Sequence, residues 1–181
     1  MTGVMSTVIR ALSVTVLAFT IAFCSAATAV ADDPDNWPVA QGNFTSPDDP
    51  GWIFFKPQGF EGRGCGISPD GMIGCDIVPS RWPDGTPVQA GMPGPPGFYS
   101  CEGRNCPLPP ADADQIVVGP QEPAHYADSA TPEFTRDVDV LPSENRLVNG
   151  NAWCSVSQQG IVRCVTGDNG FTVFALGATL E

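Results

Sequence analysis

The chain has 181 residues, of which 20 are acidic and 8 are lysine or arginine, so its formal net charge is −12 at pH 7. This sign argues against nucleic acid and anionic membrane surfaces as partners, because both reward basic patches. The 19 prolines and 20 glycines approach the range of low-complexity disorder, whereas the aromatic residues and the seven cysteines favour a folded domain.

Residues 1–31 have the pattern of a secretory signal peptide. One positive charge, Arg10, precedes an apolar run, and small residues end it at Ala29-Val30-Ala31. Cleavage after Ala31 would remove the apolar run and Cys24 with it. A retained membrane anchor is the alternative, since the run approaches the length that spans a bilayer. We therefore expect a secreted protein, extracellular or in the cell envelope, with no membrane span after cleavage.

Residues 32–50 are acidic and rich in turn formers, which predicts a flexible N-terminal arm. Residues 51–181 are enough for one domain, and we expect a single β domain there. Short aromatic and β-branched runs alternate in it with Gly, Pro, Asn-Gly and Asp-Gly turns, a pattern typical of all-β proteins. QIVVG, residues 115–119, is a clear strand, whereas residues 124–129 allow at most one short helix.

Two segments with the same cysteine spacing, CGISPDGMIGC at 65–75 and CSVSQQGIVRC at 154–164, predict two similar β-hairpins. Each has a glycine, Gly71 or Gly160, where a three-residue loop needs the left-handed conformation. The two cysteines of a hairpin would then form a non-hydrogen-bonded pair, about 4.5 Å apart at Cα, within reach of a disulfide. We interpret the repeat as an internal duplication, although the spacing leaves cross-pairing between the hairpins open.

Alternation along the arms of each hairpin places the cysteines and two aliphatic residues on one face, which needs a core to cover it. The opposite face differs between the copies. It carries Gly66 and Gly74 in the first hairpin, and Ser155 and Arg163 in the second.

The segments FFKPQGF, GCGISPDGMIGCDI and WCSVSQQGIVRC, with Gly170-Phe171 after them, resemble a family of small secreted proteins of actinobacteria, mycobacteria among them. The family pattern is an aromatic strand and a Pro-x-Gly turn before a cysteine hairpin, then a C-terminal cysteine hairpin that closes on a Gly-Phe strand. The resemblance implies a secreted protein with structural cysteines. It carries over no catalytic residue, because the family has no assigned activity, and residues 80–145 depart from its pattern.

Residues 90–110, AGMPGPPGFYSCEGRNCPLPP, predict a long Pro/Gly-rich loop that a third disulfide would clamp. The fold we expect is thus a small all-β domain stapled by disulfides and built around two hairpins, with long Pro/Gly-rich loops. Its expected disulfide residues are Cys65, Cys75, Cys101, Cys106, Cys154 and Cys164.

The same loop holds the residues that we expect to bind a partner, Phe98, Tyr99 and Arg104, because these types are enriched at interfaces. Arg104 would also suit a trypsin-like pocket. A protease-inhibitor-like protein that presents the rigid loop 101–106 is therefore an alternative.

The sequence has no recognisable catalytic constellation. His125 is the sole histidine, no nucleophile pattern accompanies it, and the cysteine spacings differ from those of zinc and redox motifs. Asp112 with Asp114, and Asp137 with Asp139, lack the pattern of a calcium loop, so we expect neither a metal nor another cofactor. The sequence therefore predicts a non-enzymatic extracytoplasmic binding module with an unknown protein or cell-envelope partner. A hydrolase of envelope polymers or peptides, acting through unidentified carboxylates, is the alternative.

Overall fold

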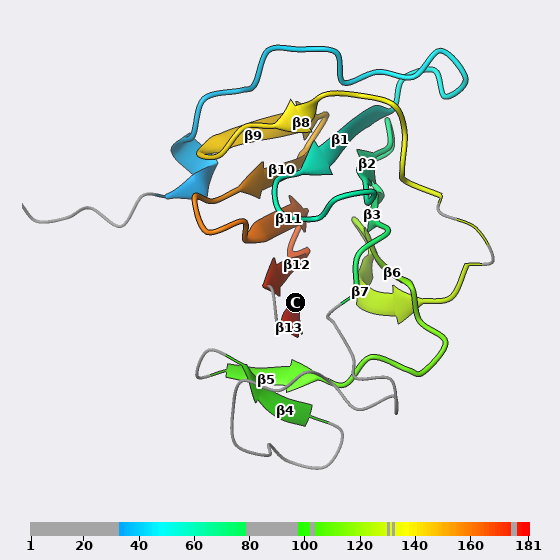
Figure 1. Ribbon diagram of the computed structural model, residues 1–181, viewed down its shortest axis with the longest axis vertical. Coiled ribbons are helices and arrows are strands. Elements are labelled where there is room, and N and C mark those ends of the chain that lie inside the picture. Colours follow the sequence, from blue (N-terminus) through cyan, green and yellow to red (C-terminus); the bar gives the residue numbers. More distant parts are fainter. Residues whose placement is uncertain (1–32, 79–97, 102–103, 130, 132, 175–176) are drawn as a thin grey trace, which may run out of the picture. The chain divides into compact units, whose positions relative to one another are not determined.

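The computed structural model describes residues 33–78, 98–101, 104–129, 131, 133–174 and 177–181, and of residues 98–101, 104 and 105 the backbone alone. Within these ranges the chain is almost entirely β: thirteen strands and one 3₁₀ helix, η1 (Pro34–Asn36) (Figure 1). The all-β fold is confirmed. None of the described residues belongs to a helix with the length and apolarity required to cross a membrane.

The N-terminal sheet has six strands in the order β7-β6-β3-β2-β1-β8, all antiparallel except β8 beside β1. They are β1 (Ile53–Pro57), β2 (Cys65–Ile67), β3 (Ile73–Cys75), β6 (Gln115–Gly119), β7 (Glu122–Ala127) and β8 (Val140–Leu141). Strand β6 is the predicted QIVVG strand. The short helix allowed near residues 124–129 is wrong, because pairing with β6 holds this segment extended and buries Ala124.

The C-terminal sheet has five antiparallel strands in the order β13-β12-β11-β10-β9, so each strand lies beside its neighbour in the chain (Figure 1). They are β9 (Asn145–Asn149), β10 (Ala152–Val156), β11 (Val162–Thr166), β12 (Asn169–Phe174) and β13 (Gly177–Leu180). The N-terminal sheet contains the same order of antiparallel pairs in β1-β2-β3-β6-β7, with strands β4 (Phe98–Cys101) and β5 (Arg104–Pro107) inserted in the chain between β3 and β6. Both sheets thus hold a five-stranded meander whose second and third strands form a cysteine hairpin.

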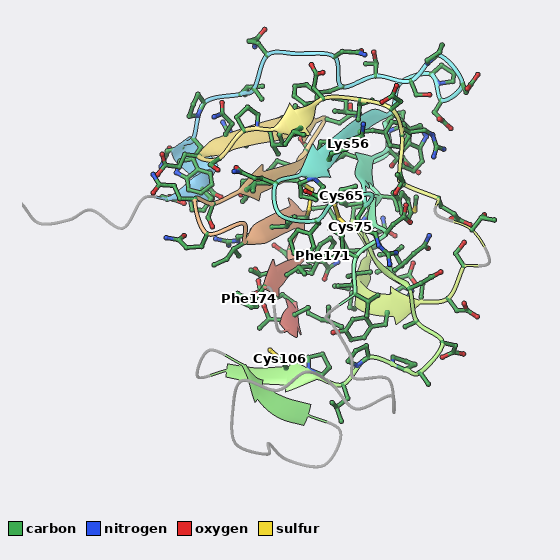
Figure 2. The ribbon with its side chains drawn as sticks, in the orientation of Figure 1. Lys56, Cys65, Cys75, Cys106, Phe171 and Phe174 are labelled. Carbon is green, nitrogen blue, oxygen red and sulfur yellow. A yellow bond between two sulfur atoms is a disulfide. The ribbon has the colours of Figure 1, made fainter. Side chains whose placement is uncertain are left out.

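The cysteines of each hairpin are directly opposite each other. Cys65 is bonded to Cys75 and Cys154 to Cys164, with Cα atoms 4.0 and 4.1 Å apart. Figure 2 shows the first pair on neighbouring strands. Two predicted disulfides and the predicted register are confirmed, and cross-pairing between the hairpins is excluded.

The turns of the two hairpins are also alike. Gly71 and Gly160 have φ angles of 89° and 74°, the left-handed conformation that glycine adopts without strain. The hydroxyls of Ser68 and Ser157 accept hydrogen bonds from the backbone N–H four residues later, at 2.8 and 3.1 Å. Both loops are therefore closed by the same glycine conformation and the same serine hydrogen bond.

The apolar faces of the two sheets meet in one core, which contains both disulfides. Strand β2 packs against β10, β3 against β11, and both β6 and β7 against β12. Phe55, Leu141 and Phe171 are among the largest side chains that this core excludes from water. Because both inner faces are used for packing, the polar positions of the hairpins are left on the two outer faces.

A two-stranded ribbon, β4 (Phe98–Cys101) with β5 (Arg104–Pro107), occupies part of the predicted Pro/Gly loop. Cys106 is disulfide-bonded and fully buried, and it clusters with Phe174 (Figure 2). The side chain of Cys101 lies outside the described residues, so its bond to Cys106 stays a prediction.

Because the two bonded loops have the same length, we expect the two disulfides to stabilise the fold equally. Replacing either pair, Cys65→Ala with Cys75→Ala or Cys154→Ala with Cys164→Ala, should lower the free energy of unfolding by about 3 kcal/mol in the chain-entropy model. Urea unfolding of both double variants measures this. Costs that differ by more than about 2 kcal/mol would show that one hairpin depends on its disulfide far more than the other.

Candidate functional site

The outer face of the N-terminal sheet is closed by residues 133–136. Gly66 and Gly74 are opposite each other on β2 and β3, and their missing side chains leave a hollow. The ring of Phe134 fills it so closely that a Cβ atom on Gly74 would overlap the ring. Phe134 is consequently buried, and glycine is required below it.

A buried carboxylate anchors this closing segment to the sheet. Asp76 is 1% exposed. It accepts hydrogen bonds from the backbone N–H groups of Glu133 and Phe134 at 3.0 and 2.9 Å, and from the Thr135 hydroxyl at 2.6 Å. The side chain of Gln115 donates a fourth at 2.9 Å. Such charge-assisted hydrogen bonds compensate the burial of the carboxylate.

Arg136 completes the closure. Its Nε and Nη2 donate to the two carboxylate oxygens of Asp49 at 2.7 and 3.3 Å, and its guanidinium lies 4.8 Å from the centre of the Phe54 ring. The hydrogen bond to Arg136 holds the pKa of Asp49 below its ordinary value, and the same bond raises the pKa of Arg136. Trp52 stacks on Phe54 at 5.5 Å. The charged groups Asp49, Asp76 and Arg136 all have partners, so we interpret this face as structural.

The corresponding face of the C-terminal sheet carries a polar row instead. Ser155 on β10 is directly opposite Arg146 on β9 and Arg163 on β11. The row continues through Thr172 on β12 to Thr179 on β13. Side chains opposite each other on one face lie about 5 Å apart. Ser155 and Arg163 occupy the hairpin positions that are glycines in the other copy.

The segment before β1 brings an aromatic ring over this row. The backbone N–H of Ala40 donates to the Arg146 carbonyl at 2.9 Å, and the N–H of Arg146 donates to the Pro38 carbonyl at 3.0 Å. Val39 and Arg146 thereby form a parallel bridge at the edge of β9. Residues 38–40, part of the predicted arm, are thus attached to the C-terminal sheet and position the neighbouring Trp37.

A cleft of about 350 Å³ lies between Trp37 and strands β10 to β12, and we name it the Trp37 cleft. Polar residues of the row, Ser155, Arg163 and Thr172, line it from the sheet, and Ile161 adds an apolar side chain. The remaining lining residues come from η1, the turn before β9 and the second hairpin: Pro34, Glu144, Ser157, Gln158 and Gln159.

Three side-chain atoms in the described part of the chain are buried without a hydrogen-bond partner, and all three belong to this face. They are Trp37 Nε1, which belongs to the cleft, and Arg146 Nε and Thr179 Oγ1 in the polar row. A buried polar group without a partner costs about 1–3 kcal/mol, and most such groups in proteins are paired. Their concentration on one face makes this face the candidate site.

In the described part of the chain, unpaired charges and backbone strain are also found at the Trp37 cleft and the polar row beside it. Among the described residues, neither Arg146 nor Arg163 has a carboxylate within ion-pair distance. Arg163 lies over the Trp153 ring, 5.7 Å from its centre. Glu144, at the cleft, has a φ of 57°, the one positive value among the described residues other than glycine. Strain of this kind is concentrated at functional sites.

The predicted partner residues belong to the two-stranded ribbon. Phe98, Tyr99 and Arg104 lie on β4 and β5, and their side chains are outside the described residues. His125 is exposed on β7, with Nδ1 3.1 Å from the Pro123 carbonyl oxygen. In the ranges that the structure describes, no group of three or more His, Cys, Asp or Glu could hold a metal ion.

One feature of the sequence distinguishes the sheet that carries the Trp37 cleft. The outer face of the second hairpin has Ser155 and Arg163 where the first has glycines. The two copies therefore differ at the positions that the Phe134 ring covers in the first hairpin. Trp37 has no such sequence signal, because it reaches the cleft through the contacts of Pro38 and Ala40 with Arg146, which lies far away in the sequence.

We expect Gly74→Ala to lower the free energy of unfolding by about 1–3 kcal/mol, because the new methyl group overlaps the Phe134 ring. Phe134→Ala should cost about 3–5 kcal/mol. In the double variant the methyl group enters the space that the ring has left, so the combined cost should be smaller than the sum. Urea unfolding of the four proteins in the cycle tests this, and additive costs would place the ring elsewhere.

The pKa of Asp49 predicts a loss of stability in acid. In the unfolded chain the pKa of Asp49 is about 3.8, and in the folded protein the hydrogen bond from Arg136 lowers this pKa. Asp49 therefore stabilises the folded protein at pH values above 3.8, and this stabilisation is lost as the pH falls through the pKa of the folded state. Below about pH 4, stability should fall less steeply in Asp49→Asn than in the unchanged protein, and Arg136→Gln should flatten the curve in the same way. An unchanged slope in both variants would refute the assignment.

Comparisons of the chain with models of protein families, with curated proteins and with solved structures find no match. The Trp37 cleft is therefore interpreted from its own geometry.

Proposed function

We propose that this protein is a secreted, non-enzymatic binding module whose ligand site is the Trp37 cleft. The observation that carries the proposal is a cleft lined by Trp37, whose buried indole N–H has no partner among the described residues, and by Arg163, a cation without an ion pair among them. A concave site with a few convergent polar groups is the usual form of a small-molecule site.

The leader-like residues 1–31 and the fully buried disulfides support secretion, since such bonds persist in oxidising compartments. The partner of such a module would be met outside the membrane, in the cell envelope or beyond it.

The side chains at the cleft support binding rather than turnover. Hydroxyl, amide and guanidinium groups dominate, and Glu144 is the one carboxylate among the described residues that line it. That carboxylate accepts a hydrogen bond from Gln158 Nε2 at 2.7 Å. Most glycoside hydrolases need two carboxyl groups that flank the scissile bond.

The test is a panel of neutral and acidic sugars, amino acids, dicarboxylates and short acyl carboxylates, monitored by melting temperature and tryptophan fluorescence. A ligand that occupies the cleft should raise the melting temperature and change the fluorescence, and Trp37→Phe should remove most of the fluorescence change. Trp52→Phe, on the other sheet, is the matched control and should preserve it.

Glu144→Gly provides a second check. Because glycine accepts a positive φ without strain, the free energy of unfolding should stay the same or rise by up to about 1 kcal/mol, while the ligand binds more weakly. If the ligand binds Glu144→Gly and Trp37→Ala as tightly as the unchanged protein, the cleft is not the site. Turnover of any panel compound would refute the non-enzymatic part of the proposal.

A further inference from the structure

We infer that the Trp37 cleft binds an acidic monosaccharide, with the sugar carboxylate on Arg163 and the sugar ring against Trp37. This inference names the ligand class for the proposed function above and rests on it.

The cations of this face favour an anion. Two charged residues among those described line the cleft itself, Arg163 and Glu144, and the Glu144 carboxylate already accepts a hydrogen bond from Gln158. The chain carries a net charge of −12, yet this face holds two arginines, Arg146 and Arg163, without an ion pair among the described residues. A guanidinium presents a planar fork of donors that matches a carboxylate. The contact with the Trp153 ring restrains Arg163, and its neighbours across the strands, Ser155 and Thr172, add hydroxyl groups beside it.

The rest of the lining suits a ring that carries hydroxyl groups. Ser157, Gln158 and Gln159 can each donate and accept hydrogen bonds, as sugar hydroxyls do. The face of an aromatic ring favours the weakly positive C–H face of a sugar, and Trp37 brings such a ring to the cleft. A volume of about 350 Å³ lies at the lower end of small-molecule sites, which limits the ligand to a small molecule.

The N-terminal sheet supports the size of this ligand. At the corresponding place on its meander, the six-membered ring of Phe134 fills the hollow over Gly66 and Gly74. The C-terminal sheet has polar side chains at those hairpin positions, Ser155 and Arg163. A ligand over them meets hydroxyl and guanidinium groups, which favour a polar and negatively charged molecule.

The experiment is isothermal titration of the disulfide-intact protein with glucuronate, glucose and acetate at equal ionic strength. We expect glucuronate to bind at least about tenfold more tightly than glucose and acetate, because it alone offers both a carboxylate and a sugar ring. Arg163→Gln should weaken glucuronate binding roughly 10- to 150-fold, the range of a charge-assisted hydrogen bond, and leave the affinity for glucose unchanged.

Two variants separate charge from stacking. Trp37→Ala should weaken glucuronate and glucose by the same factor, and because Trp37 is outside the core it should not unfold the protein. Lys56→Gln removes an equal charge from the other sheet, where Lys56 lies on β1 (Figure 2) and pairs with Asp137, and should leave binding unchanged.

Equal affinity for acetate and glucuronate would overturn the sugar assignment, and equal effects of Lys56→Gln and Arg163→Gln would overturn the assignment of the carboxylate to Arg163. Absence of binding by all three probes would overturn the ligand class. The proposed function would then still stand if another compound of the panel changes the Trp37 fluorescence, and would fall if none does.

Discussion

The register of the two cysteine hairpins is the constraint on which the rest of the structure depends. Side chains of a strand alternate between two faces, so a slip by one residue would exchange the faces of the whole strand. In the second hairpin such a slip would turn Ser155 and Arg163 into the core and Cys154 and Cys164 out of it. The disulfide between directly opposite cysteines prevents this, and the left-handed glycine in the turn fixes the same register from the other end.

With the inner faces committed to one core, the two copies differ on their outer faces. Glycines at 66 and 74 make a hollow that a single aromatic ring fills, and the closing segment satisfies the carboxylate of Asp76. Serine and arginine at the same hairpin positions instead present polar groups that need partners. One copy is therefore closed by a segment of the chain, whereas the other carries buried polar atoms without a partner among the described residues.

The sequence predicted the features that depend on local spacing. The hairpins, two disulfides, the turn glycines and strand β6 all follow from residues that lie within eleven positions of one another. The sequence did not predict strand β7, because its extended form depends on pairing with β6 rather than on its own composition. The contacts of Asp76 with residues 133–135 and of Pro38 and Ala40 with Arg146 join distant segments. No local periodicity encodes such contacts, so the Trp37 cleft became visible only in the fold.

The arginines of the two outer faces differ in a way that links binding to stability. Arg136 has a carboxylate, two carbonyl groups and an aromatic ring as partners, so its charge contributes to the folded state without a ligand. Arg163 has the ring of Trp153 and, among the described residues, no carboxylate. A ligand carboxylate would form with Arg163 the kind of ion pair that Asp49 forms with Arg136. Because Trp37 lies on the segment that residues 38–40 attach to the edge of β9, a ligand held by both Trp37 and Arg163 would also tie that segment to the sheet.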